Sequence, residues 1–218
     1  MDKLLLSPSL VCGNLLNLEK DIEVFLKHHV DYLHIDIMDG KFVPNIALGF
    51  GLANALAKFP ISRDIHLMVS DPELAISKLL LNKNDIVLFH KEATKNTDKI
   101  ISLVSEKCKV GLVINAQTSI KAVYPYLTKI DFLYLMTIQR TGFSGEPFDE
   151  NSYPRAKDIC SYISNNNLQT IVGVDGAIGI EQIKNFRKIG VRLFVLGSKA
   201  IYFGNNMEKN LIHLQETL

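Results

Sequence analysis

Short apolar runs rich in β-branched residues alternate along this chain with longer amphipathic segments. Each short run has the length and composition of a buried strand, and the longer segments repeat apolar residues at helical spacing. The runs predict eight strands, at Leu4–Val11, Tyr32–Met38, Asp64–Val69, Asp85–His90, Lys109–Ile114, Phe132–Met136, Gln169–Val174 and Leu193–Leu196. The amphipathic segments predict helices at Leu16–Lys27, Pro72–Leu81, Thr97–Lys107, Ser119–Leu127, Ser152–Asn165 and Ile180–Ile189.

The alternation of strands and helices predicts the fold. Strands separated by helices run parallel, and eight such units in 218 residues predict an α/β protein with a single (β/α)8 TIM barrel. An open doubly wound sheet would need a Gly-rich turn after its first strand, and Ser7-Pro8-Ser9-Leu10 is not such a turn. Because no linker or repeat interrupts the series, we expect residues 1–218 to form one domain.

Composition narrows the class of protein. Apolar residues make up 47% of the chain, and 24 basic residues nearly balance 23 acidic ones, which argues against disorder and against nucleic-acid binding. The 3 cysteines form no CxxC pair, and no apolar stretch approaches the ~20 residues of a membrane span. With no signal-like N-terminal segment, we expect a reduced, cytoplasmic protein with a small-molecule ligand and no membrane partner.

Charged residues interrupt the second predicted strand, "DYLHIDIMDGKFVPN" at residues 31–45. Unpaired charge in an apolar setting costs several kcal/mol, so these residues need a local reason. Alternation along a strand places His34, Asp36 and Met38 on one face and the neighbouring apolar residues on the other. That face therefore combines an imidazole and a carboxylate inside the predicted barrel.

Other polar residues fall near the ends of further strands. His66 belongs to the third, His90 ends the fourth, and Asp175 follows the seventh. Active sites of these barrels gather at the C-terminal ends of the strands, so these residues should converge there. Two imidazoles and two carboxylates are suitable ligands for one divalent ion, and Zn, Fe(II), Mn and Co all fit such a donor set. For any single histidine, a hydrogen-bonded interior position is the plain alternative.

Methionines occupy similar positions. Met38 lies two residues beyond Asp36, Met68 lies two residues beyond His66, and Met136 ends the sixth strand. Thioether side chains could form an apolar, polarizable cap over a reacting carbon without offering an acid. Ordinary core filling is the alternative.

Glycine-bearing loops follow the last three strands. The segment "TGFSGEPF" covers residues 141–148, Gly176 follows the seventh strand, and Gly197-Ser198 follow the eighth. Barrels of this type often hold phosphate with backbone N–H groups of their late loops. The loops therefore predict a phosphate site, although turns also need glycine.

At this point the chain resembles the ribulose-phosphate 3-epimerases and their D-allulose-6-phosphate relatives. The shared text comprises "SPSL", "HIDIMDGKFVPN", "HLMV", the pair His90 and Glu92-Ala93, "GLVIN", "MT" with "GF-x-G", "VDG" and "GS", in family order between residues 7 and 203. The resemblance implies that His34, Asp36, His66 and Asp175 bind a divalent metal. It further implies that Asp36 and Asp175 are the acid/base pair, that Ser9 contacts substrate, and that Met38, Met68 and Met136 cap the reacting centre.

The activity that the resemblance implies has a simple chemical requirement. Inverting the carbon beside a ketone removes a proton from one face and returns one to the other, through an enediolate that a metal would stabilise. The expected substrate pair is D-ribulose 5-phosphate and D-xylulose 5-phosphate. The expected phosphate contacts are backbone groups of Gly142, Phe143, Ser144, Gly145, Gly176, Ala177, Gly197 and Ser198. A homo-oligomer is expected, without a readable interface.

Departures from the family pattern leave alternatives. The loop from Gln139 to Glu146 is one residue longer, lacks a proline, and contains Arg140 as a potential added cation for phosphate, although a loop arginine usually points to solvent. "SPSLVCGNLL" and "GEPF" look more like the allulose-phosphate branch, which keeps D-allulose 6-phosphate and D-fructose 6-phosphate as an alternative pair. A non-catalytic sugar-phosphate-binding protein is a third interpretation. A barrel decarboxylase that acts on a phosphorylated substrate is disfavoured, because enzymes of that group place a lysine between their acids and "HIDIMD" contains none.

Overall fold

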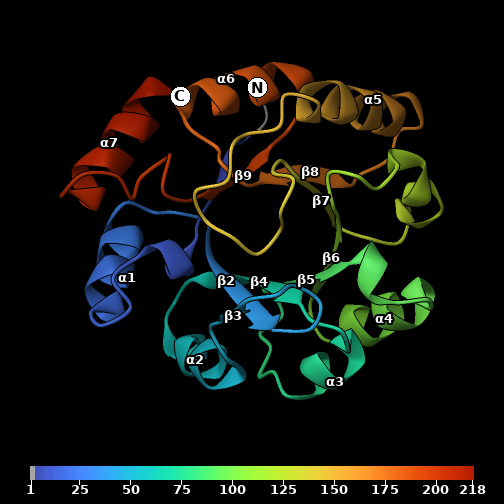
Figure 1. Ribbon diagram of the computed structural model, residues 1–218, viewed down its shortest axis with the longest axis horizontal. Coiled ribbons are helices and arrows are strands. Elements are labelled where there is room, and N and C mark those ends of the chain that lie inside the picture. The colour runs from blue at the N-terminus through green and yellow to red at the C-terminus, as the bar shows by residue number, and fades with distance from the viewer. Residues whose placement is uncertain (1–2) are drawn as a thin grey trace.

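The computed structural model describes residues 3–218 and shows a ring of strands enclosed by helices (Figure 1). The strands are β1 Leu5–Pro8, β2 Tyr32–Asp39, β3 Ile46–Ala47, β4 Ser62–Met68, β5 Ile86–His90, β6 Lys109–Ile114, β7 Phe132–Met136, β8 Ile171–Asp175 and β9 Leu193–Leu196. The α-helices are α1 Leu18–Lys27, α2 Phe50–Ala55, α3 Pro72–Ser77, α4 Thr97–Ser105, α5 Ser152–Asn165, α6 Ile180–Ile189 and α7 Met207–Thr217. The predicted (β/α)8 barrel is confirmed.

The strands follow one another around the barrel. Their order is β1-β9-β8-β7-β6-β5-β4-β2-β3, and every neighbouring pair is parallel except β2 with the two-residue strand β3. A parallel bridge between Ser9 and His34 joins β1 to β2. The Asp31 N–H also donates to the Leu6 carbonyl at 3.2 Å. These contacts close the barrel and bring the ends of β1 and β2 together.

Alternation along the strands divides the core into two layers. Leu33, Ile35 and Ile37 of β2 pack in the large cluster that includes residues of the surrounding helices. The strand residues that point to the other side, into the barrel, form a second cluster, which includes Leu88 and Tyr134. Since β2 is almost fully buried, the polar residues of its inner face lie inside the barrel rather than in solvent.

One predicted helix is wrong. Residues 119–127 form two short 3-10 helices, Ile120–Ala122 and Tyr124–Tyr126, instead of one α-helix. Pro125 has no N–H to donate within a helix, so the apolar spacing there does not become a continuous α-helical segment.

Helix α3 is shorter than predicted. After Ser77 the chain tightens, and Lys78 N–H donates to the Ala75 carbonyl. The Leu80 N–H donates to the side-chain oxygen of Asn54 at 2.8 Å instead of continuing the helix. Helices α2 and α7 complete the ring and were not among the predicted helices. Within residues 3–218, no helix combines the length and apolar character that crossing a bilayer requires.

Candidate active site

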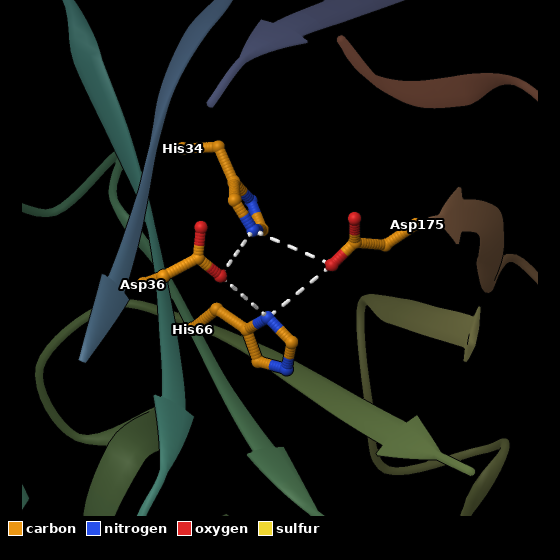
Figure 2. A group of neighbouring side chains, drawn as sticks. All are labelled: His34, Asp36, His66 and Asp175. Atoms are coloured by element: carbon orange, nitrogen blue, oxygen red, sulfur yellow. Dashed lines mark hydrogen bonds and ion pairs between the residues drawn. The ribbon is translucent and has the colours of Figure 1, made fainter. Parts of the chain in front are cut away.

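Four side chains meet at the C-terminal ends of three strands. Figure 2 shows His34 and His66 facing each other, with Asp36 and Asp175 on opposite sides between them. His34 Nε2 lies 3.1 Å from Asp36 Oδ1 and 3.5 Å from Asp175 Oδ2. His66 Nδ1 lies 3.2 Å and 3.4 Å from the same two oxygens. The structure thus brings together all four residues that the sequence predicted as metal ligands, here called the four-residue cluster.

The cluster is buried, and its charges shift each other's pKa values. Burial disfavours the charged imidazolium of His34, but the negative charges of Asp36 and Asp64 outweigh it and raise the pKa well above the ordinary value. Burial likewise opposes ionisation of Asp36, yet the charge and hydrogen bond of His34 lower its pKa. The pKa of Asp175 is also lowered, because its close contacts with the ring nitrogens of His34 and His66 outweigh the effect of burial. The histidines therefore favour the ionised form of each carboxylate.

A third carboxylate, which the sequence analysis did not select, lies beneath His34. Asp64 of β4 is fully buried, and its Oδ2 lies 2.9 Å from His34 Nδ1. The same oxygen accepts hydrogen bonds from Ser7 Oγ at 3.0 Å and Tyr134 OH at 2.7 Å. A carboxylate accepts a hydrogen bond from the imidazole, so Nδ1 of His34 carries a hydrogen. Nε2 is the nitrogen that faces the cluster, and it would supply the lone pair to a bound metal ion.

The four residues fit a divalent metal ion. Two ligand atoms about 2.1 Å from one ion at tetrahedral angles lie about 3.4 Å apart, which agrees with the nitrogen–oxygen separations of 3.1–3.5 Å in the cluster. His66 Nδ1 is buried and makes no hydrogen bond within the part of the chain that the structure describes. A metal ion would occupy that lone pair and compensate the two buried carboxylates.

A pocket opens above the cluster. Met38, Met68 and Met136 line it together with Asp36 and Asp175, and all three methionine side chains are buried. Ser9 also lines the pocket, and its Oγ donates to Asp36 Oδ2 at 2.9 Å. The methionines thus form an apolar wall next to the two carboxylates, while Ser9 holds the oxygen of Asp36 that faces away from the histidines.

The glycine-bearing loops line the same pocket. The lining includes all eight residues predicted for phosphate: Gly142, Phe143, Ser144, Gly145, Gly176, Ala177, Gly197 and Ser198. Figure 1 shows the connection between β7 and α5 extending over the middle of the ring. Gly176 has φ +117°, and a Cβ there would lie 2.9 Å from the side chain of Ile138. This conformation and this close approach require glycine.

Arg140 contacts two residues that line the pocket but does not line it itself. Its guanidinium is 3.5 Å from Glu146 Oε1, and its side chain is 66% exposed. The guanidinium also lies over the ring of Phe143, 4.7 Å from the centroid. Arg140 is not part of the pocket lining, whereas Lys199 is. Among residues 3–218, the cationic side chain in the pocket lining is Lys199, which directly follows Gly197-Ser198. The sequence analysis did not select it.

Other lining residues were also missed. Cys12 and Asn45 line the pocket, and Asn45 Nδ2 donates to the Gly142 carbonyl at 2.7 Å. Asn45 belongs to the quoted "HIDIMDGKFVPN" motif, so that motif was the available signal for it. Asp64 lies two residues before His66 on the same strand and therefore on the same face, and this spacing was the available signal for it.

The fold and the site together define a class of protein. The chain is a parallel (β/α)8 barrel, and two histidines and two aspartates are buried at its C-terminal mouth below a glycine-lined pocket. This arrangement is typical of a barrel enzyme with acid/base or metal chemistry. The model of the ribulose-phosphate 3 epimerase family matches residues 5–202. The chain therefore belongs to this family, which is a family of carbohydrate epimerases, and the predicted class of isomerase is confirmed.

Individual relatives match over nearly their whole length. The ribulose-phosphate 3-epimerase of Schizosaccharomyces pombe is 29% identical over 98% of this chain and 93% of its own. That of Escherichia coli strain K12 is 28% identical over 100% of this chain and 97% of its own.

Solved structures agree with the fold. KGPDC from Streptococcus mutans superposes with a TM-score of 0.66 at 15% identity, covering 99% of this chain and 97% of that chain. A 3-hexulose-6-phosphate synthase superposes with a TM-score of 0.61 at 17% identity, covering 98% and 99%. At this identity the likeness supports the barrel architecture alone.

Proposed function

We propose that this chain interconverts D-ribulose 5-phosphate and D-xylulose 5-phosphate by inverting the carbon next to the ketone. The observation that carries the proposal is the placement of Asp36 and Asp175 on opposite sides of one buried cluster (Figure 2). Inversion needs a proton carrier on each face of the carbon, and these two carboxylates supply one each. The relatives named ribulose-phosphate 3-epimerase support this choice of substrate.

The surrounding residues suit this chemistry. At the start of each turnover one of the two side chains must be an ionised carboxylate and the other must hold a proton. The carboxylate accepts the proton from the substrate, the acid delivers its own proton to the opposite face, and the two side chains thereby exchange protonation states. The Ser9 hydrogen bond fixes the orientation of Asp36. The three methionines exclude water from the reacting carbon and offer no competing acid, so the planar intermediate persists until it is protonated by an aspartate.

We further propose that the cluster holds one divalent ion through His34, Asp36, His66 and Asp175. Such an ion would stabilise the negative charge that develops on the substrate oxygens. Imidazole and carboxylate donors accept Zn, Fe(II), Mn and Co alike, so the donor set does not select among them.

The glycine-bearing loops would hold the phosphate. Backbone N–H groups in this kind of turn are suitable donors to an anion, and Lys199 adds a positive charge at the same pocket. A structural neighbour, KGPDC from Streptococcus mutans, was also solved in complex with a pentose phosphate. That complex supports a phosphorylated sugar as the ligand class for this fold.

The altered loop after β7 leaves a second pair of sugar phosphates as candidate substrates. Residues 139–146 depart from the family pattern at the place where the far end of the substrate would bind, so the pair D-allulose 6-phosphate and D-fructose 6-phosphate is the alternative. An NMR panel of ketose phosphates with metal analysis of the purified protein tests the proposal. We expect D-ribulose 5-phosphate to give the highest kcat/KM, whereas preference for D-allulose 6-phosphate would reassign the substrate. Conversion of neither would refute the proposed activity.

Phosphate recognition can be tested by comparing Arg140 with Lys199. Because the Arg140 side chain is exposed and does not line the pocket, Arg140→Ala should change KM for the phosphorylated ketose by less than about threefold. Lys199→Ala should raise KM by roughly tenfold, since a charge-assisted contact is worth about 1.5–3 kcal/mol. Steady-state kinetics of both variants provide the measurement. The reverse order of effects would place the arginine, and not the lysine, at the phosphate.

A comparison of phosphorylated and unphosphorylated ketose tests the loops themselves. We expect much lower catalytic efficiency without the phosphate. Equal efficiency would mean that the glycines serve only as turns.

A further inference from the structure

The second ring nitrogen of His66 faces another histidine. His66 Nε2 lies 2.8 Å from Nε2 of His90, which ends β5, and both side chains are fully buried. The rings are nearly parallel, with an interplanar angle of 17° and centroids 5.0 Å apart. Two ring nitrogens at this distance share one hydrogen, so one of them donates and the other accepts.

A metal ion bound at Nδ1 of His66 would determine which of the two Nε2 atoms donates. If Nδ1 of His66 presents its lone pair to the ion, the neutral imidazole carries its hydrogen on Nε2 and donates it to His90. His90 must then accept through Nε2 and carry its own hydrogen on Nδ1. The opposite arrangement would place the His66 hydrogen on Nδ1, between the two carboxylates, where it blocks the ligand position.

Glu92 favours the first arrangement. His90 Nδ1 is 3.5 Å from Glu92 Oε2, which is too long for a good hydrogen bond but close enough for electrostatic attraction. Within residues 3–218, His90 Nδ1 has no other hydrogen-bond partner. The other oxygen of Glu92 accepts from the Asn115 N–H at 2.9 Å and from Thr118 Oγ1. Burial opposes ionisation of Glu92, but its hydrogen bonds outweigh burial and lower its pKa to about 2. A fixed carboxylate therefore faces His90 Nδ1 and stabilises a hydrogen on that atom.

We propose that Glu92 and His90 are positioning residues that hold the hydrogen of His66 on Nε2 and so keep its Nδ1 open for the metal ion. This inference rests on the proposed metal site. Asp64 orients His34 by accepting a hydrogen from the ring nitrogen that faces away from the cluster, and His90 would orient His66 in the same way. The two histidines are thereby oriented by separate partners, one from β4 and one from the segment that follows β5.

The hydrogen positions can be measured directly in the zinc-loaded protein. NMR of protein labelled with ¹⁵N in histidine distinguishes protonated from unprotonated ring nitrogens. We expect His90 to carry its hydrogen on Nδ1 and to accept at Nε2, with His66 protonated at Nε2. A hydrogen on Nε2 of zinc-loaded His90 would overturn the proposal, and this result needs no variant.

Variants test the effect on metal affinity. The amide of Glu92→Gln can either donate to His90 or accept from it, so the preference for one hydrogen position is lost. We expect zinc affinity, measured by competition with a chelating dye, to fall about 10–100-fold. The control Glu106→Gln alters an exposed glutamate at the end of α4 and should keep normal affinity. Unchanged affinity in Glu92→Gln would contradict the proposed relay.

A pair of substitutions separates hydrogen bonding from packing at His90. His90→Phe keeps an aromatic ring but removes the acceptor for His66, and should weaken zinc binding about 10–100-fold. His90→Gln restores an acceptor oxygen and should recover affinity to within about tenfold of the native protein. Equal affinities in the two variants would mean that His90 acts by packing alone. Because zinc affinity is measured without substrate, a protein that fails to epimerise could still confirm the relay.

Discussion

Asp36→Asn and Asp175→Asn should each reduce epimerase turnover by about 10²-fold or more. Each substitution keeps the shape of the side chain but removes the carboxylate that we propose as the proton carrier for one face of the substrate. The two carboxylates lie on opposite sides of the cluster, so neither can substitute for the other (Figure 2). Turnover in both directions, measured by NMR with metal content determined in parallel, tests this expectation.

Proton exchange distinguishes the two variants from a general loss of structure. A variant with one intact carboxylate should still exchange the substrate proton on the face that this carboxylate serves. Asp98→Asn is a matched control, because Asp98 pairs with Lys129 on an exposed surface. Near-normal epimerisation in either active-site variant, with metal bound, would show that the assignment of two bases is wrong.

Removal of the metal should abolish activity and lower the melting temperature. The ion would compensate two buried carboxylates and engage two buried histidines, so the folded state that binds it is stabilised. Chelation followed by dialysis, with activity and thermal unfolding measured before and after, provides the test. Adding back Zn, Mn, Co or Fe(II) should restore both properties for the ions that fit. A metal-free preparation with full activity would exclude metal dependence.

The sequence predicted the barrel because its strands are short, apolar and regularly spaced. Lys109–Ile114, Phe132–Met136 and Leu193–Leu196 have the predicted bounds, since strands buried on both faces read as uninterrupted apolar runs. Residues 119–127 could not be predicted as well, because their apolar spacing suits a helix while Pro125 prevents one. Helix α2 is brief and contains Gly51, which weakens its helical pattern.

The convergence of the four cluster residues was predictable, but the contacts that support them were not. Period-two alternation placed His34 and Asp36 on one face, and the barrel rule brought His66 and Asp175 to the same end. Asp64 joins Ser7 and Tyr134, which lie 57 and 70 residues away along the chain, so only the folded structure reveals their meeting. The hydrogen bond between His66 and His90 likewise depends on ring orientations that no sequence pattern specifies.

The most direct test of the central claim is proton exchange at the reacting carbon. The protein, loaded with its metal, is incubated with D-ribulose 5-phosphate in deuterated water, and ¹H NMR follows the hydrogen on carbon 3. Two-base inversion predicts that D-xylulose 5-phosphate forms with deuterium at this carbon and without release of carbon dioxide. Formation of the product with its original hydrogen fully retained would contradict inversion by two separate carboxylates, and absence of both exchange and product would contradict the proposed activity.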